Sequence, residues 1–435
     1  MEGEGVAHAD GYTFFVPYAM KGEQVKVAAD RIKGSLVFAH IIKMLSPSPD
    51  RRETGCPLFG KCGGCTLRHL PYEEQITIKK ENVRALFKKN AGFDPGELSF
   101  VGSGEDGYRN KIALPFGMAE GEAVLGMYKR GTHKVLPLER CPLHGDWIEP
   151  LIREVLDFVR EKKISVYDEG SGKGLLRHLV ARRLSTSDGV EYGVILVLNG
   201  EKLPRESELA DRLSKALFGK LNLYLCKNTL RNNVILTSEI RTIFGEDYLC
   251  AELCGERAEV SPLAFLQVNF PIAERIYRAV VEVIPEGGTV VDAYSGTGIM
   301  SALLAKKAKK VIGIETIADA VKDANANAAR FGVSDRVKHL CGEVESLLPT
   351  LAPDFGKYDL VVDPPRAGLD EKVVDTILAY PPEHILYVSC SPATLTRDLA
   401  KLGEKYRVED VTLYDMFPFT PHVETVVLMK RRFDN

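Results

Sequence analysis

A chain of 435 residues is too long for one packed core, so the sequence predicts two or three domains. Its 45% hydrophobic and 27% charged residues are typical of a globular protein, and no apolar run is long enough to span a membrane. The formal net charge of −3 excludes a uniformly basic nucleic-acid-binding protein but is compatible with one basic face. Because the first residues lack the basic and apolar segments of a signal peptide, we expect a cytoplasmic protein.

The pattern of apolar residues changes along the chain. Short apolar runs alternate with Gly and Pro through residues 3–45 and predict a small β-barrel. Apolar residues at helical spacing predict a helix over 72–90, and strand-like runs from about 108 to 262 predict a mixed central domain. From residue 263 onward strands and helices alternate regularly, which predicts an α/β fold with a parallel sheet.

A group of cysteines precedes the predicted helix. Cys56, Cys62 and Cys65 form the pattern C-x5-C-x2-C, and Cys141, which precedes a proline, is the candidate fourth member. In a cytosolic protein such spacing indicates metal or redox chemistry rather than disulfide bonds. Four thiolates suit either a zinc ion or a cubane iron–sulfur cluster, and the spacing alone leaves both open. We expect the site to be structural rather than reactive.

Three successive strand-like runs in the last third of the chain are followed by acidic residues. The first run ends at Asp292 and leads into a turn that contains Gly296 and Gly298. The second ends at Glu315, which can accept hydrogen bonds from both hydroxyls of a ribose. The third leads to Glu343, which can accept one from an adenine amino group. The turn lacks the dinucleotide pattern G-x-G-x-x-G, so S-adenosylmethionine is favoured over NAD. Helix caps or solvated turns are the alternative for each acid.

The next strand-like runs carry residues suited to catalysis. The segment from Asp363 to Arg366 reads D-P-P-R and resembles a loop of amino-methyltransferases, but an arginine stands where those enzymes have an aromatic residue. Cys390 ends another apolar run, where a thiol can act as a nucleophile. Such a thiol suits methylation of a pyrimidine at carbon 5, because this carbon becomes nucleophilic only after a thiolate adds to carbon 6.

Together these motifs resemble the RNA uracil-5-methyltransferase family, in particular its iron–sulfur-containing 23S ribosomal RNA branch, over nearly the whole chain. The resemblance implies a Rossmann-like class I methyltransferase domain, a mixed α+β central domain and an N-terminal TRAM-like RNA-binding β-barrel. We assign residues 1–49 to the barrel, 50–70 and 97–262 to the central domain with its iron–sulfur site, and 71–96 and 263–435 to the methyltransferase domain. The sequence begins inside the usual strand order of this barrel, which leaves an incomplete barrel as an alternative.

The resemblance also implies residue roles. Cys390 matches the family's nucleophile and Glu424 its base. The residues expected to bind S-adenosylmethionine are Gln267, Tyr294, Glu315, Glu343 and Asp363. The expected ligands of a 4Fe-4S cluster are Cys56, Cys62, Cys65 and Cys141. Two positions depart from the family pattern, since Glu343 stands where an aspartate is common and Ile299 where a polar residue can contact the cofactor.

We therefore expect an S-adenosylmethionine-dependent enzyme that methylates carbon 5 of a specific uridine in RNA through a covalent cysteine–uracil intermediate. The favoured substrate is 23S ribosomal RNA. The same chemistry on transfer RNA is an alternative, because no motif reports the surface shape that selects an RNA. Two less favoured hypotheses are an amino-methyltransferase and a non-catalytic RNA-binding factor. The protein is expected to act as a monomer that does not engage a membrane.

Overall fold

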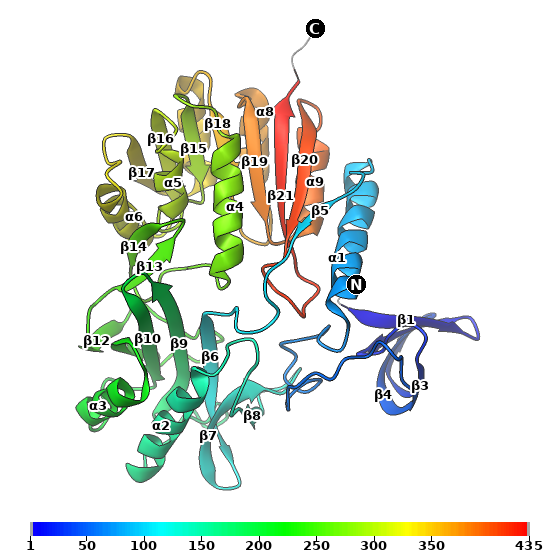
Figure 1. The fold of residues 1–435 in the computed structure, drawn as a ribbon, viewed down its shortest axis with the longest axis vertical. Helices are drawn as coiled ribbons and strands as arrows, with labels where there is room; N and C mark the ends of the chain where they lie inside the picture. The colour runs from blue at the N-terminus through cyan, green and yellow to red at the C-terminus, as the bar shows by residue number, and fades with distance from the viewer. Residues whose placement is uncertain (1–2, 433–435) are drawn as a thin grey trace.

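The computed structural model describes residues 3–432, whose strands form an N-terminal, a central and a C-terminal sheet together with a separate hairpin (Figure 1). The N-terminal sheet has the strand order β1-β2-β4-β3. Its strands are β1 (Glu4–Ala9), β2 (Tyr12–Pro17), β3 (Gln24–Lys33) and β4 (Leu36–Ser46). Val16, Val37 and Ala39 form its small core. Since β1 and β3 are the two edges of the described sheet, its strands do not close into a barrel.

The central sheet has the order β12-β11-β10-β9-β6-β7-β8. Its strands are β6 (Lys111–Ala119), β7 (Glu122–Tyr128), β8 (Val135–Pro137), β9 (Leu176–Thr186), β10 (Gly189–Leu198), β11 (Lys220–Lys227) and β12 (Ile240–Phe244). Helices α2 (Ile148–Glu161) and α3 (Glu206–Ala216) cover one face. Leu151, Val155 and Phe158, spaced by four and three, are fully buried there, as expected for the apolar stripe of an amphipathic helix.

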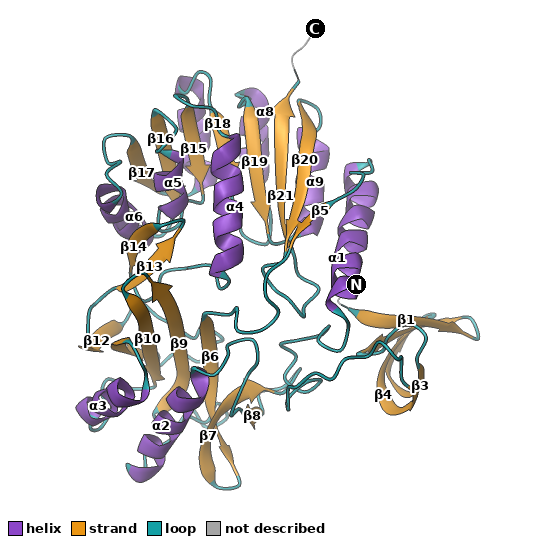
Figure 2. Ribbon diagram, in the orientation of Figure 1, coloured by secondary structure: helices purple, strands orange, loops and turns teal. Residues whose placement is uncertain are grey.

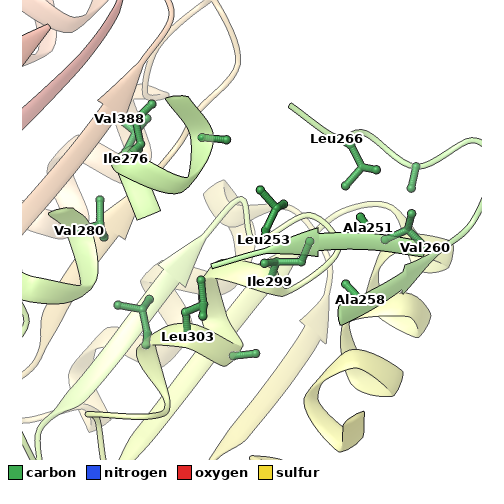
Figure 3. Close-up of a cluster of buried hydrophobic side chains, with 14 of the residues drawn as sticks. Ala251, Leu253, Ala258, Val260, Leu266, Ile276, Val280, Ile299, Leu303 and Val388 are labelled. Carbon is green, nitrogen blue, oxygen red and sulfur yellow. The ribbon is translucent and has the colours of Figure 1, made fainter. Parts of the chain in front are cut away.

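The other face of the central sheet packs against the hairpin of β13 (Leu249–Leu253) and β14 (Glu256–Val260). This hairpin belongs to a hydrophobic cluster that continues into the C-terminal part of the chain. Figure 3 shows Leu253 of the hairpin beside Ile299 of the C-terminal part, with Ile276 and Val388 further along the same cluster. One continuous core therefore joins the central sheet to the C-terminal domain.

The C-terminal sheet has the order β17-β16-β15-β18-β19-β21-β20-β5. Its strands are β15 (Thr289–Ala293), β16 (Lys310–Glu315), β17 (Val337–Cys341), β18 (Asp359–Val362), β19 (His384–Ser389), β20 (Tyr406–Tyr414), β21 (Glu424–Arg431) and β5 (Ser99–Val101). The strands run parallel except β21, which is antiparallel to both of its neighbours. Strand β5 lies within the range 97–262 that the sequence assigned to the central domain, but it pairs with β20 in this sheet.

Helices cover both faces of the C-terminal sheet (Figure 2). One face carries α4 (Phe270–Val283), α5 (Ile299–Leu304) and α6 (Ala318–Arg330). The other carries α7 (Val344–Leu351), α8 (Glu371–Ala379), α9 (Pro392–Leu402) and α1 (Tyr72–Leu86). Neighbouring Val290 and Val291 belong to opposite faces, as expected from the alternation of side chains along a strand. This is the predicted α/β fold with a mainly parallel sheet.

The predicted helix over 72–90 is confirmed, with its last turn, Phe87–Ala91, widened into a π-helix. No helix within residues 3–432 is both long and apolar enough to span a membrane. After β15 the chain builds β16 and β17 on one side and then returns to place β18 on the other. In open α/β sheets ligands bind at such a reversal, outside the carboxyl ends of the strands.

Candidate active site

A crevice opens at this reversal, where β15 and β18 end. Three of the residues predicted to bind the cofactor, Gln267, Tyr294 and Asp363, contribute to its lining. Phe265, whose side chain is 73% exposed, and the buried Asp292 also line it. The sequence therefore places residues from the segment before α4 and from two strand ends around one cavity.

The turn after β15 shapes the floor of the crevice. Tyr294, Gly296 and Gly298 have φ angles of 68°, 53° and 75°, so the chain reverses through left-handed conformations before α5 begins. At Gly298 a Cβ atom would lie only 2.6 Å from the Cβ of Ala324, so a larger residue would clash with α6. The Ser295 hydroxyl is buried beside Gly313 and has no hydrogen-bond partner among the described residues. An unpartnered buried hydroxyl is expected to bond to a ligand or water.

Glu315 connects the end of β16 to this turn. Its carboxylate accepts hydrogen bonds from the backbone N–H of Gly296 (3.0 Å) and of Ile317 (2.9 Å). Each oxygen thus uses one lone pair and keeps another for a ligand such as a ribose. Glu315 does not line the crevice itself but lies beside the turn that does.

Glu343 and the hydroxyl of Tyr294 lie at helix α7 rather than in the crevice. Glu343 is exposed at the start of α7, where the backbone N–H of the preceding Gly342 bonds to the carbonyl of Glu315 (2.9 Å). The hydroxyl of Tyr294 donates to Glu345 of α7 (3.1 Å), so this end of the ring is directed toward α7. Only the rest of Tyr294 is available to a ligand in the crevice.

The predicted nucleophile and base lie on neighbouring strands. Ser389, the last residue of β19, is opposite Thr425 of β21, so Cys390 and Glu424 are adjacent to this pair. Cys390 is half-buried and Glu424 is only 4% exposed. Burial, followed by the nearby carboxylates of Glu424 and Asp363, raises the pKa of the Cys390 thiol, and Arg366 opposes this shift. The charges of Asp363 and Arg366, which follow β18, and of Glu424 on β21 therefore all act on Cys390 at the end of β19.

The carboxyl groups of Glu424 and Asp363 both have raised pKa values. Burial and then Asp363 raise the pKa of Glu424 to about 8, whereas Arg366 lowers it. Asp363 can be reached from solvent through the crevice, but the protein atoms that surround it raise its pKa to about 7. Carboxyl groups with a pKa near neutrality can both take up and release a proton at physiological pH.

The four cysteines of the predicted cluster lie on two loops, between β4 and α1 and between β8 and α2. Burial, followed by the Cys141 thiol, raises the pKa of Cys65 to about 12, and burial raises that of Cys141 to about 11 with Cys56 and Cys62 contributing. The thiols are therefore near neighbours. Within residues 3–432, however, no group of three or more His, Cys, Asp or Glu side chains is arranged to hold a metal ion.

The loop that leads to Glu424 is held by residues that the sequence did not single out. The backbone N–H of Phe419 donates to Gln75 of α1 (2.9 Å), and Lys79 donates to the carbonyl of Phe417 (3.2 Å). Lys79 also forms an ion pair with Asp415. The sequence does contain a pattern that predicts their burial, because Gln75 and Lys79 are spaced by four residues from each other and from the apolar Val83 and so lie on the same face of the helix.

The cysteine loop contacts the same segment. The backbone N–H groups of Thr66 and Leu67, which follow Cys65, both donate to the carbonyl of Phe419 (2.9 Å each). The guanidinium of Arg68 lies 4.3 Å from the centre of the Phe419 ring. The loop that carries three of the four cysteines is thus bonded to the segment that ends at the predicted base.

Comparison with known proteins identifies the family. The chain is 35% identical over 435 residues to an uncharacterized RNA methyltransferase of Halalkalibacterium halodurans, with 99% of this chain and 94% of the relative covered. It is 34% identical over 433 residues to an uncharacterized RNA methyltransferase of Clostridium tetani, covering 98% and 94%. A family model described as tRNA (uracil-5-)-methyltransferase matches residues 350–432, which contain Cys390 and Glu424. The chain belongs to the RNA uracil-5-methyltransferase family.

A solved structure of this family supports the fold. Pyrococcus abyssi tRNA (uracil-54, C5)-methyltransferase, whose crystal structure was solved in complex with S-adenosyl-L-homocysteine, is 27% identical in sequence to the present chain. It superimposes with a TM-score of 0.78 and covers 99% of this chain and 100% of the other. A second family model, described as RNA cap guanine-N2 methyltransferase, matches residues 287–376, which include the turn after β15. The chain is an S-adenosylmethionine-dependent RNA methyltransferase, as predicted.

Proposed function

We propose that this enzyme methylates carbon 5 of a uridine in RNA through a covalent bond between Cys390 and carbon 6 of the base, with 23S ribosomal RNA as the favoured substrate. The observation that supports this most is the position of Cys390 and Glu424 at the ends of two paired strands, next to Asp363. An amino-methyltransferase requires neither a nucleophilic thiol nor a base beside it.

The residues of the crevice fit S-adenosylmethionine. Gln267 contributes a polar side chain to the lining of the crevice, and Glu315 has lone pairs free for a ribose. Glu343 lies next to Glu315, where it can accept a hydrogen bond from the adenine, and the body of Tyr294 can pack against the methionine part. When bound, S-adenosylmethionine supplies an electrophilic methyl group.

The side chains of the site then act in sequence. The Cys390 thiol gives up its proton to solvent, and the thiolate forms a bond to carbon 6 of the uracil. The electron pair of the carbon 5–carbon 6 double bond moves into an enolate, which makes carbon 5 nucleophilic. After carbon 5 has been methylated, Glu424 removes the proton from it, and the electron pair of that bond expels Cys390. Arg366 is the cation that favours the ionised forms of Cys390 and Glu424.

The target base must leave its stack to reach Cys390, because a paired and stacked uracil does not expose carbon 6. Phe265 is 73% exposed at the mouth of the crevice, which suits stacking against an unpaired base. We therefore propose that Phe265 stacks with the target uridine or with its neighbour.

Methylating a mixture of 23S ribosomal RNA fragments and transfer RNA with methyl-labelled S-adenosylmethionine tests the function. We expect 5-methyluridine at a defined position of the ribosomal RNA. Product in transfer RNA alone would instead support the substrate that the family model and the Pyrococcus abyssi enzyme favour by name. Methyladenosine would support an amino-methyltransferase, and the absence of transfer to any RNA would support a non-catalytic RNA-binding factor.

We also propose that Cys56, Cys62, Cys65 and Cys141 hold a 4Fe-4S cluster. The four neighbouring thiols are the donors that such a cluster takes, and the backbone N–H of Gly64 donates to the Cys62 sulfur (3.5 Å), as is common around iron–sulfur sites. For a cluster to bind, the two loops must move so that the four sulfur atoms come within bonding distance of the irons. Protein purified without oxygen should contain about four irons per chain. A colourless protein with one zinc per chain would contradict this proposal.

The proposal also covers the role of the N-terminal sheet, the domain boundaries, the oligomeric state and the cellular location. The N-terminal sheet would act as the TRAM-like RNA-binding module, and the domains would span 1–49, 50–70 with 97–262, and 71–96 with 263–435. We propose that the enzyme acts as a cytoplasmic monomer. Sedimentation of the protein with and without RNA tests the oligomeric state.

A further inference from the structure

Two cationic side chains face each other across strands β6 and β9 of the central sheet. Lys111 is directly opposite Arg182 in the antiparallel register, so both side chains project from the same face. Arg109 lies two residues before Lys111 and is close enough to influence its protonation. Like charges directly opposite each other destabilise a sheet, so this arrangement opposes folding unless an anion lies between them.

No carboxylate of the described residues 3–432 neutralises these cations. None of the three forms an ion pair with any other residue of the described range 3–432. Arg182 is 4% exposed; its Nη2 donates to the carbonyl of Ala264 (3.0 Å), and its Nη1 is buried without a partner. Burial, together with Arg182 and Arg109, lowers the pKa of Lys111 to about 8. A buried charge without a partner is costly, and an anionic ligand would remove much of that cost.

The cations lie beside the mouth of the crevice. Ala264, which Arg182 contacts, immediately precedes the exposed Phe265. Asn110, between Arg109 and Lys111, donates from its side chain to the carbonyl of Gln267 (3.0 Å). The face of the central sheet that carries Lys111 is therefore bonded to the segment that forms one wall of the crevice.

Two anions could reach this place, a phosphate of the RNA and the methionine carboxylate of S-adenosylmethionine. Lys111 and Arg182 on the central sheet and Arg109 just before it are not part of the crevice lining, which Phe265 and Gln267 form on this side. The position therefore favours the phosphate.

We propose that Lys111, Arg109 and Arg182 form a binding site for a backbone phosphate of the RNA, beside the nucleotide that enters the crevice. The proposal rests on the proposed function, since it assumes an RNA substrate at this crevice. Lys111 and Arg109, both half-buried, contact the phosphate directly, and Arg182, whose Nη1 is buried, adds its positive charge beside Lys111. Such contacts position the backbone and carry no sequence information.

The test measures binding of a short fluorescein-labelled oligouridine by anisotropy at several salt concentrations. Lys111→Gln and Arg109→Gln should each weaken binding about tenfold, as expected for a lost charge-assisted hydrogen bond. Each should also make the log–log salt dependence about 0.7 less steep, because one phosphate contact to a single strand is lost. Lys215→Gln is the matched control, since Lys215 is exposed on α3 of the same domain and should change neither value.

Three further outcomes separate the possible roles. S-adenosylhomocysteine should bind the Lys111→Gln variant as it binds the wild type; weaker binding would assign the cations to the methionine carboxylate and overturn the proposal. An unchanged affinity and salt slope in both variants would also overturn it. Lys111→Met should not lower the melting temperature, because it removes a buried charge that faces two arginines. A lower melting temperature with an unchanged salt slope would show that Lys111 is structural and would overturn the proposal.

These outcomes are distinct from a failure of the proposed function. If no RNA is methylated by the wild type but Lys111→Gln still reduces the RNA affinity and the salt slope, the phosphate site stands and the methylation chemistry fails. If 5-methyluridine forms at wild-type rates in both variants with unchanged RNA affinity, the phosphate site fails and the function stands.

Discussion

Lys79 and Asp415 form an ion pair, with Nζ 2.6 Å from Oδ1, in which neither side chain is exposed to solvent. The hydroxyl of Tyr72 donates to the other oxygen of Asp415 (2.9 Å). The pair fastens helix α1 to the start of the loop between β20 and β21, whose last residue precedes Glu424. A contact between residues 336 positions apart thus supports the segment that carries the proposed base, Glu424.

Removing one member of this pair should be strongly destabilising. Lys79→Met leaves Asp415 buried without its cation, so we expect a loss of about 3–5 kcal/mol in the free energy of unfolding, measured in urea. Lys80→Met, at the next and less buried residue of the same helix, should change it by less than about 0.5 kcal/mol. Equal effects of the two substitutions would show that the ion pair does not support the loop.

The proposed nucleophile predicts a separation of catalysis from cofactor binding. Cys390→Ala should abolish methyl transfer, because carbon 5 is not activated without addition at carbon 6, while S-adenosylhomocysteine binds as before. The matched control is Cys341→Ala, since Cys341 is an exposed cysteine at the end of β17 in the same sheet. Methylation at the wild-type rate by Cys390→Ala would rule out the covalent mechanism.

The raised pKa of Glu424 predicts how the last step depends on pH. As a base Glu424 must be ionised, and burial raises its pKa to about 8. The rate of proton removal from carbon 5 should therefore rise with pH up to about 8 and then level off. This is measurable as tritium release from RNA labelled at carbon 5 of uracil.

Replacing the base should stop the reaction after addition and methylation. We expect Glu424→Gln to accumulate a covalent RNA–protein adduct that is visible on a denaturing gel and to lose the pH-dependent rise. An adduct-free Glu424→Gln variant that still releases tritium with the wild-type pH profile would assign the proton transfer to another group, of which Asp363 is the nearest candidate.

The sequence was sufficient to predict that the proposed catalytic residues, Cys390 and Glu424, lie close to Asp363, which was predicted to bind the cofactor. Asp363, Cys390 and Glu424 stand at the ends of strands in one sheet, and strand ends can be recognised from apolar runs. The Lys111–Arg182 pair could not be predicted, because register between distant strands is set by tertiary packing rather than by local pattern.

Short strands and loops were predicted less well. Strand β5 has only three residues and owes its place in the C-terminal sheet to its pairing with β20, which no local pattern reports. The cysteine spacing predicted a metal or iron–sulfur site, but no group of residues within 3–432 is arranged to hold a metal ion, because the positions of the four sulfurs depend on loop conformation. Sequence periodicity carries no information about that conformation.

The place of Glu315 beside the turn of β15 predicts its contribution to cofactor binding. Glu315→Ala removes a charged acceptor for the ribose and also releases the backbone N–H of Gly296, so S-adenosylhomocysteine should bind about 10- to 150-fold more weakly, a loss of about 1.5–3 kcal/mol. Glu343→Ala is the comparison, since Glu343 is exposed and its loss should cost less. Calorimetric titration measures both, and unchanged affinity in Glu315→Ala would contradict the assignment of the crevice to the cofactor.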